Sequence, residues 1–400
     1  MKLYAQHGHA PADKMRRAAE DRFIDGVIIS PRFTLQASAR EMIAGLRVLN
    51  PQIDIILDPE FYAISFVGTP NAQLRYLDQW PHFVQRRRND LLVGTASVDE
   101  TLQQAFRVQM DLDCSLLIAP NIYVSNSFDS IEAAISIAFV SRAQIVAAQM
   151  GVTLPVYTTI AVSKDAMINR NEYVSFLNAL TAVEPAPEGV YILVGSGPTD
   201  ARLGTSRSEI MVPEVIGGWM MLNYTLALNG FRTINGCSDI LTPLLGITRG
   251  HAGATGWWSN LQVFSMGRYI KGQAGGQLPI VRYFSKSLLN RITINRLEAY
   301  VEIVGSIMNG LTSDRFYEGG DPNRTEEALQ SWQALGALNA ELITGNLNDD
   351  LERFDNHVSR AVECYEELRL NGFSEGYEAN IEYLQTLNES VRIFRELAEI

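Results

Sequence analysis

Short apolar, β-branched runs alternate along the chain with longer segments of helical periodicity. Eight runs lie between residues 2 and 259, and each stops at Gly, Pro, Asn, Asp or Ser. They read KLYAQHG, DGVIISP, DIILDP, CSLLIAPN, PVYTTIAVS, GVYILVGSG, FRTINGCSD and AGATGWWS. The segments between them repeat apolar residues every three or four positions, as amphipathic helices do. Strand followed by helix, eight times, predicts an α/β fold, a (β/α)8 TIM barrel.

The last two strand-helix units are the weakest, because the segment TPLLGITRG supports only one or two helical turns. An open, doubly wound sheet is therefore the alternative fold. Such a sheet would carry a GxGxxG loop after an early strand, and none of the first strands is followed by one. The GSGP at 195–198 precedes a segment without helical periodicity, so we interpret it as a loop.

The predicted barrel spans residues 1–284 and contains a long insertion at about 60–98. The arginine run of that insertion, QRRRND, is either a solvated loop or a contact for phosphates. Residues 285–400 form a predicted helical C-terminal extension that packs on the barrel or on a partner. Its last helix carries an apolar stripe made of Leu384, Leu387, Val391, Phe394 and Leu397.

Charge is distributed unevenly between these two regions. The chain carries a net charge of −12, and residues 297–400 hold 21 acidic and 7 basic side chains, a net of −14. The acidic faces are solvated helix surfaces or part of an interface, and a polyanion would have to approach the barrel. Three cysteines without a CxxC pair, the lack of a signal pattern and apolar runs shorter than about 18 residues favour a cytoplasmic protein with no membrane contact.

The active site of a (β/α)8 barrel lies at the carboxyl ends of its strands, so the residues that end each run are the candidates. Together they predict a polar ring with an aromatic wall. They are His7, His9, Ser30, Asp58, Glu60, Asn121, Ser163, Lys164, Ser196, Asn235, Cys237, Asp239, Trp257, Trp258 and Asn260.

The pair His7 and His9 resembles the start of a metal-dependent amidohydrolase site. Such a site also needs histidines that end the fifth and sixth strands and an aspartate that ends the eighth. Those positions read VSK, GSG and GWW, so we expect no metal and no cofactor. One histidine then serves as a hydrogen-bonding group in the mouth and the other as a helix cap. A Schiff base on Lys164 is a separate hypothesis that rests on the strand-end position alone.

Three segments resemble the tRNA-guanine transglycosylases. They are DIILDPEFY at 54–62, GVYILVGSG at 189–197 and GRYIKGQAGGQLPIVRYFSKSLL at 267–289. The resemblance implies that Asp58 binds a purine-type base and takes part in proton transfer. It also implies that the glycine-ended strand contacts the base through its backbone.

Two features of that family are absent from this sequence. The nucleophilic aspartate that ends the last strand is replaced by AGATGWWSN, and the zinc-binding cysteines and histidine after the barrel are missing. Asp239, at the end of the seventh strand, is the nearest replacement nucleophile, with Asp58 as acid or base. A helix cap for Asp239 and a turn for Asp58-Pro59 are the structural alternatives.

We therefore predict a transglycosylase-like protein that binds guanine or a 7-deazaguanine and transfers it to a nucleic acid or another acceptor, a protein included. The alternative is a catalytically inactive purine-binding or scaffold barrel that docks a partner. Relatives in antiviral defence operons are part of what the resemblance implies, and we expect a homodimer or a partner complex through the C-terminal helices. The predicted catalytic residues are Asp58 and Asp239. The predicted binding residues are His7, His9, Glu60, Tyr62, Asn121, Lys164, Gly195, Ser196, Asn235, Trp257, Asn260 and Arg268.

Overall fold

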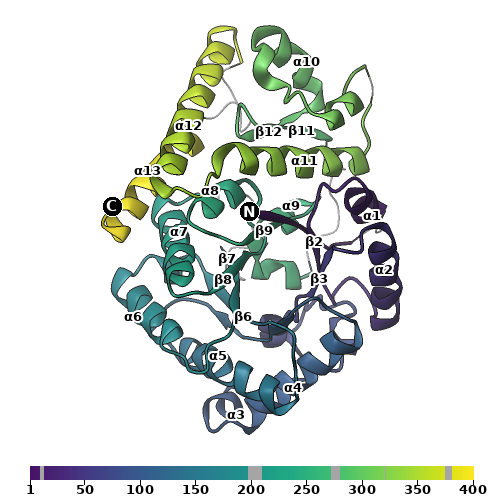
Figure 1. Ribbon diagram of the computed structural model, residues 1–400, viewed down its shortest axis with the longest axis vertical. Helices are drawn as coiled ribbons and strands as arrows, with labels where there is room; N and C mark the ends of the chain where they lie inside the picture. The colour runs from purple at the N-terminus through teal and green to yellow at the C-terminus, as the bar shows by residue number, and fades with distance from the viewer. Residues whose placement is uncertain (10–12, 197–209, 272–279, 320, 374–380) are drawn as a thin grey trace.

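A parallel sheet that curves into a nearly closed barrel forms the centre of the protein. The computed structural model describes residues 1–9, 13–196, 210–271, 280–319, 321–373 and 381–400. The strand order is β3-β2-β1-β9-β8-β7-β6-β4 (Figure 1). This order confirms the predicted (β/α)8 barrel and contradicts the open-sheet alternative. The strands are β1 (Lys2–Gln6), β2 (Gly26–Ile29), β3 (Asp54–Leu57), β4 (Leu117–Ala119), β5 (Tyr123–Val124), β6 (Val156–Ser163), β7 (Gly189–Ser196), β8 (Arg232–Asn235), β9 (Ala252–Thr255) and β10 (Phe264–Ser265).

Single hydrogen bonds bridge the seam between β3 and β4. The main-chain nitrogen of Ser115 donates to the carbonyl oxygen of Ile55 at 2.7 Å. The nitrogen of Ile55 in turn donates to the Ser115 hydroxyl at 2.9 Å. Where the two strands separate, the Ser115 hydroxyl thus accepts the hydrogen bond that a main-chain carbonyl group would accept in a regular parallel sheet.

Helices surround the barrel on its outer face (Figure 1). Side chains cap two of them, because Ser130 accepts from the nitrogen of Ala133 and Asn169 accepts from the nitrogen of Glu172. The helices are α1 (Asp13–Glu20), α2 (Gln36–Leu49), α3 (Arg88–Leu92), α4 (Ala96–Asp111), α5 (Ile131–Gln149), α6 (Arg170–Thr181), α7 (Pro213–Leu228), α8 (Thr242–Ile247) and α9 (Ser259–Gln262).

Helix α5 is long and apolar enough to cross a membrane by length and composition. In this fold it packs against β5, β6, α4 and α6 on the outside of the barrel. Its buried side chains include Ile135, Phe139 and Val146, so its apolar character is that of a core helix.

Alternation along the strands divides the core into two layers. In β7, Tyr191 and Leu193 pack inside the barrel with Tyr4, whereas Ile192 and Val194 pack between the strands and the helices. Both layers are almost completely closed to solvent. The barrel interior is therefore a packed core, and open space is confined to its mouth.

The C-terminal region is not purely helical. It opens with an antiparallel pair, β11 (Arg282–Ser285) and β12 (Asn290–Thr293), which the sequence analysis assigned to the end of the barrel and the start of a helix. Four α-helices follow: α10 (Ile294–Ile303), α11 (Arg324–Leu342), α12 (Leu347–Leu370) and α13 (Glu382–Ala398).

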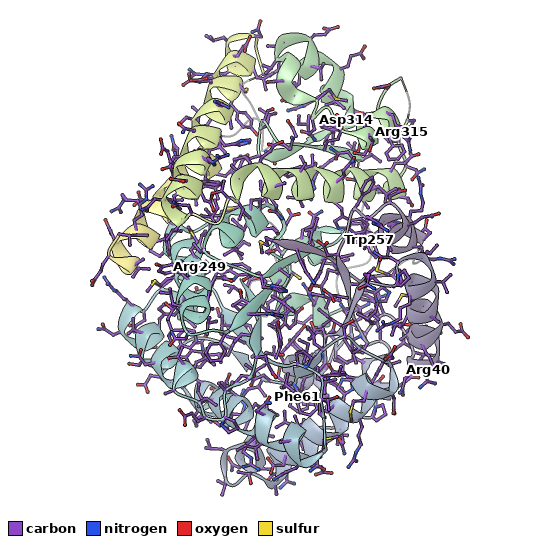
Figure 2. All side chains as sticks on the ribbon, viewed as in Figure 1. Arg40, Phe61, Arg249, Trp257, Asp314 and Arg315 are labelled. Carbon is purple, nitrogen blue, oxygen red and sulfur yellow. The ribbon has the colours of Figure 1, made fainter. Side chains whose placement is uncertain are left out.

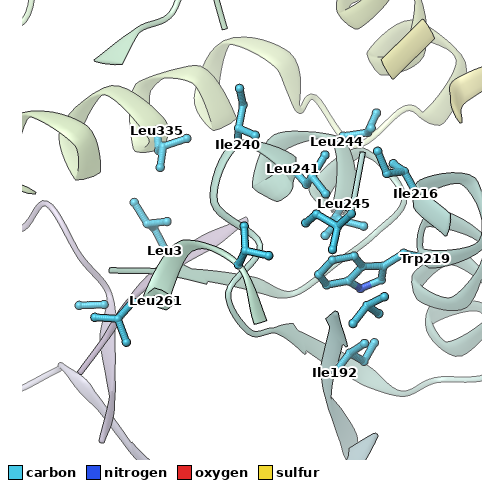
Figure 3. Close-up of a cluster of buried hydrophobic side chains, with 14 of the residues drawn as sticks. Leu3, Ile192, Ile216, Trp219, Ile240, Leu241, Leu244, Leu245, Leu261 and Leu335 are labelled. Atoms are coloured by element: carbon cyan, nitrogen blue, oxygen red, sulfur yellow. The ribbon is translucent and has the colours of Figure 1, made fainter. Parts of the chain in front are cut away.

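Helix α11 occupies the eighth helical position of the barrel. The helix directly after β9, α9, has only 4 residues, whereas α11 packs against α1, α8 and β1. Leu335 of α11 shares one apolar cluster with Leu3 and Ile240 of the barrel (Figure 3). The barrel thus depends on the C-terminal region to cover its last strand.

Helix α13 lies along α7, and the apolar stripe predicted for it faces that helix. Leu384, Leu387, Val391 and Phe394 are all buried. The helices approach closely because Gly217 of α7 has no side chain: a Cβ there would lie 2.8 Å from Ile393. These four residues of the stripe are covered within the chain, whereas Leu397, its fifth residue, is half-buried and lines a cavity with residues of α6 and α7. The homodimer or partner complex stays a prediction.

Candidate functional site in the barrel mouth

Two acidic side chains lie together at the carboxyl end of β3. Asp58 is 1% exposed, and its carboxylate accepts three hydrogen bonds. The nitrogen of Glu60 donates to Oδ1 at 2.9 Å, and the hydroxyls of Tyr62 and Tyr191 donate to Oδ2 at 2.8 and 3.1 Å. Burial raises the pKa of Asp58, while these donors oppose the rise. Asp58 is thus a nearly saturated acceptor.

The two carboxylate oxygens of Glu60 differ in their hydrogen bonding. Its Oε1 accepts from the Ser30 hydroxyl at 2.5 Å, whereas Oε2 is buried without a hydrogen-bond partner among the described residues. Burial, with the neighbouring Asp58 charge, raises the pKa of Glu60 to about 7. The residue also has a left-handed backbone, with φ at 49°. Strain and an unsatisfied buried acceptor in one residue are typical of functional sites.

Arg268, in the turn after β10, is held by main-chain carbonyl groups. One of its terminal nitrogens donates to the carbonyl oxygens of Asn260 at 2.7 Å and Val263 at 3.1 Å, and lies 3.6 Å from the Cys237 sulfur. Its Nε is buried without a partner among the described residues. Burial and the Asp58 charge raise the pKa of Glu60, whereas the charges of Arg32 and Arg268 lower it.

A cavity of about 470 Å³ is lined in part by Arg268, whereas Asp58 and Glu60 are not among its lining residues. Its walls combine aromatic rings with guanidinium groups from four different loops. They include His9, Arg32, Phe33, Arg75, Trp258, Asn260 and Arg268. We call this the mouth cavity.

A second cavity of about 420 Å³ lies beside the insertion and is lined in part by Tyr62, Arg86, Arg88 and Glu132. Both of its arginines form ion pairs, Arg88 with Glu132 at 2.7 Å and Arg86 with Glu100 at 2.8 Å, while Nε of Arg86 is buried without a partner among the described residues. These pairs with carboxylates favour a structural role for the two arginines over the phosphate contact that the sequence analysis considered. The mouth cavity is therefore the better candidate site.

Several predicted residues do lie at or beneath the mouth. His9, Asn260 and Arg268 line the mouth cavity, while Asp58 and Glu60 lie buried next to Arg268. Tyr62 is buried. Its hydroxyl donates a hydrogen bond to Asp58, and its ring packs edge-on against Phe264 and Tyr269.

Asn121 and Asn235 do not face the mouth, contrary to the expectation of a common cavity. The amide of Asn121 donates to the carbonyl of Thr159 at 2.7 Å and bridges the interruption between β4 and β5, where Pro120 has no N–H. The amide of Asn235 faces α7 and binds Trp219 at 2.7 Å and Asn223 at 2.9 Å. Both are fully hydrogen-bonded structural residues.

The carboxylate of Asp239 also has hydrogen-bond donors within the protein. Arg291 of β12 donates to both of its oxygens at 2.6 and 2.7 Å, and Thr255 donates to one at 2.9 Å. The carboxylate and the guanidinium are both buried. As a nucleophile, Asp239 would have to leave this ion pair, which joins the barrel to the C-terminal region.

Trp257 faces the C-terminal region rather than the mouth. Its ring meets Trp332 of α11 at 6.2 Å, edge to face, at the boundary seen in Figure 2. The neighbouring Trp258 lines the mouth cavity instead. Two neighbouring residues of an extended segment point in opposite directions, which accounts for the divergence of the two rings.

The remaining predicted residues do not line the mouth cavity. His7 is buried, with its pKa lowered to about 4 by burial. Gly195 lets β10 approach β7, since a Cβ there would lie 2.0 Å from the Phe264 carbonyl oxygen. The Ser196 hydroxyl is buried without a partner among the described residues. Lys164 is half-buried and is not among the residues that line the mouth cavity.

Four residues of this site were missed by the sequence analysis: Arg32, Phe33, Arg75 and Tyr191. Arg32 and Phe33 lie three and four residues beyond the end of β2 at Ile29, so a search four residues beyond each strand end would have found them. Tyr191 is inside β7, where only alternation indicates an inward side chain. Arg75 reaches the mouth from the insertion, and no local pattern places it there.

No metal site was found among the described residues, since no three His, Cys, Asp or Glu side chains gather to hold an ion. Cys114, Cys237 and Cys364 are free. Residues 197–209 and 272–279, which include part of the GSGP loop and of the third transglycosylase-like segment, lie outside the described residues.

Comparisons with known proteins name no family for this chain. No family model matches it, and no curated protein does. Solved structures match weakly. A carboxyl transferase domain from Rhizobium etli pyruvate carboxylase with 3-bromopyruvate has a TM-score of 0.36 at 10% identity, covering 100% of this chain and 60% of that chain.

Two further structures match at a similar level. An enolase protein from environmental sequencing of the Sargasso Sea has a TM-score of 0.30 at 10% identity, over 67% of this chain and 57% of that chain. A fungal multi-domain GH3 β-N-acetylglucosaminidase with a GCN5-related glucosamine N-acetyltransferase region has a TM-score of 0.41 at 12% identity, over 91% and 42%. The chain therefore spans less than two thirds of each structure, and scores this low carry no argument about function.

Proposed function

We propose that the mouth cavity binds a guanine-type base, guanine or a 7-deazaguanine, in the manner of the transglycosylases that the sequence resembles. The observation that carries the proposal is two buried polar atoms without a hydrogen-bond partner among the described residues. They are Nε of Arg268, a donor whose residue lines the cavity, and Oε2 of Glu60, an acceptor whose residue is buried and is not part of the lining. Groups buried without partners are costly, so a ligand that pairs with both is favoured.

Guanine has the matching pattern on its ring. Its N1–H and N2–H₂ groups donate, and its O6 and N7 atoms accept. Glu60 in its ionised form suits the donors, and Arg268 suits the acceptors. Trp258 and Phe33 in the cavity wall provide rings for stacking. In this proposal the base-binding role assigned to Asp58 moves to Glu60, because Asp58 already accepts three hydrogen bonds.

Transfer of the base to a nucleic acid or other acceptor is the second part of the proposal. Glu60, with a pKa of about 7, suits proton transfer to and from the base near neutral pH. The cationic rim of the mouth, formed by Arg32, Arg75 and Arg268, suits an acceptor that carries phosphates.

A binding protein without turnover is the alternative, and one observation favours it. Asp239, the carboxylate expected to form the covalent intermediate, is held by Arg291 in a buried ion pair. A barrel that retains a base pocket but lacks a free nucleophile would bind the base and signal to a partner.

Calorimetry with guanine, 7-deazaguanine and adenine tests the base proposal. We expect adenine to bind at least about ten-fold more weakly than guanine, because its donor and acceptor are exchanged on the six-membered ring. Glu60→Gln should cost about 1–3 kcal/mol of guanine affinity. The matched control is Glu132→Gln, in the second cavity, which should leave binding unchanged.

Wild-type protein that binds neither guanine nor 7-deazaguanine would remove the proposal. Incorporation of labelled guanine into nucleic acid would separate the two candidates, since a pure binding protein holds the label without transferring it. Equal losses in Glu60→Gln and Glu132→Gln would show that the mouth cavity is not the site.

A further inference from the structure

A third cavity, of about 290 Å³, lies between α6, α7 and α13 and shares no lining residue with the mouth cavity. Figure 1 shows these three helices along the side of the molecule on which the chain ends. The apolar part of the lining includes Met167, Ile393 and Leu397. Leu397 is the half-buried fifth residue of the α13 stripe. The stripe thus ends at a space that the described residues leave open.

Apolar side chains beside this cavity are exposed to solvent. Ile168, which lines the cavity, is 52% exposed. Val174, which follows Arg170 by one turn of α6, is 42% exposed. Exposed apolar side chains that continue an apolar cavity indicate an interaction surface, whereas isolated ones need no partner. A small molecule inside the cavity would leave Val174 exposed, so a larger partner fits this surface better.

Two opposite charges at the cavity have no ion-pair partner among the described residues. They are Arg170, the first residue of α6, and Glu214, in the first turn of α7. Arg392, in the same lining, is instead neutralised within α13 by Glu389 and Glu396. The charge of Arg170 also lies at a helix N-terminus, where the helix dipole opposes it. A carboxylate from outside would satisfy Arg170, and a cation from outside would satisfy Glu214.

We propose that this face of α6, α7 and α13 is the contact between two copies of the chain. A second copy supplies both missing charges from one surface, because a two-fold axis brings Arg170 of each copy to Glu214 of the other. The same contact covers Ile168 and Leu397 of both copies. A purely acidic or purely basic partner would satisfy one of the two charges and repel the other. The face is therefore complementary to itself in charge and in apolar character.

The dimer leaves the candidate functional site open. None of the described residues that line the mouth cavity belongs to α6, α7 or α13. The inference is therefore independent of the function proposed for the mouth, and either one can fail without the other.

Sedimentation equilibrium of the full chain tests the contact. We expect the wild-type protein to form dimers at micromolar concentrations. Ile168→Asp should raise the dissociation constant at least about ten-fold, because it places a charge within an apolar contact. Val48→Asp is the matched control, since Val48 lies on α2 outside this face and is 82% exposed. It should leave the dissociation constant unchanged, and unaltered circular dichroism would show that both variants fold.

Charge reversal tests the pairing of the two copies. Arg170→Glu and Glu214→Arg should each weaken the dimer at least about ten-fold, because like charges then meet across the axis. The double variant exchanges the two charges and should regain most of the wild-type affinity. Failure of the double variant to recover would overturn the pairing of Arg170 with Glu214.

Other outcomes would overturn the proposal as a whole. A wild-type chain that stays monomeric at its highest soluble concentration would leave this face to a different partner and exclude a second copy. A dimer that withstands Ile168→Asp would place the contact elsewhere. Equal weakening by Ile168→Asp and Val48→Asp would show that the added charge, and not this face, changes the association.

Discussion

Two buried acidic centres lie near the carboxyl ends of the barrel strands, and they differ in how they are satisfied. Asp239, after β8, is neutralised by Arg291 and hydrogen-bonded by Thr255. Glu60, after β3, has an oxygen without a partner among the described residues and a pKa raised to about 7. Both residues have left-handed backbones. The two carboxylates therefore share burial and backbone strain, and they differ in the Glu60 oxygen that has no partner among the described residues.

The difference follows from which part of the chain covers each centre. The C-terminal region supplies Arg291 to Asp239, so that centre holds two parts of the protein together. Glu60 accepts a hydrogen bond from Ser30 of the β2–α2 loop, while that loop and the insertion supply Arg32 and Arg75 to the lining of the mouth cavity. The following predictions test this distinction between a structural and a ligand-binding centre.

Arg291→Met should have the largest effect. It leaves the Asp239 carboxylate buried without its cation, which typically costs about 3–5 kcal/mol of unfolding free energy. Denaturant unfolding measures the change. Arg392→Met, which removes an exposed pair with Glu389, is the control and should not move the midpoint. A small loss in Arg291→Met would mean that this ion pair does not hold the two regions together.

The pH dependence of stability should depend on Glu60. Its pKa in the folded protein, about 7, is above the model-peptide value of 4.5, so the folded state retains a proton that the unfolded state has released. The stabilisation is complete below about pH 4.5 and is lost as pH rises through 7, by up to about 3 kcal/mol. Unfolding free energies at pH 5 and 7.5 measure the loss. Glu60→Gln should reduce this loss, and an identical slope in both proteins would contradict the assigned pKa.

Asp58→Asn should destabilise the protein by about 1–3 kcal/mol, because an amide nitrogen would replace an oxygen that accepts from buried donors. The effect should appear in denaturant unfolding at neutral pH. Its control is Asp129→Asn at an exposed position, with no expected change. An unaltered stability would show that the three donors to Asp58 find other partners.

Tyr191→Phe should have the smallest effect, about 1 kcal/mol, since Asp58 loses one of its three hydrogen bonds and the ring still packs in the barrel interior. Thermal unfolding measures it. Guanine affinity should change little, because Glu60 keeps its position through Ser30. A large loss of affinity with unchanged stability would instead place Tyr191 in contact with the ligand.

The site could be predicted only in part. The strand ends after β1, β3 and β9 supplied His9, Glu60 and Asn260, because a parallel barrel brings all carboxyl ends to one face. The same rule gave a wrong position for Asn121 and Asn235, because the side chain of a residue at or next to a strand end can point to a helix instead of the mouth. Sequence position alone does not distinguish these two directions when the strand ends at a break such as Pro120.

The sequence by itself determined the barrel, because eight apolar runs separated by helical periodicities bury their surface in one closed parallel sheet. It also determined the location of the candidate chemistry at the strand ends. Only the tertiary structure decided that α11 is the eighth helix, that Asp239 is neutralised by Arg291, and that Glu60 keeps an unpaired oxygen. Each of these depends on contacts between residues far apart in the sequence. Such contacts produce no local periodicity, so the sequence alone does not predict them.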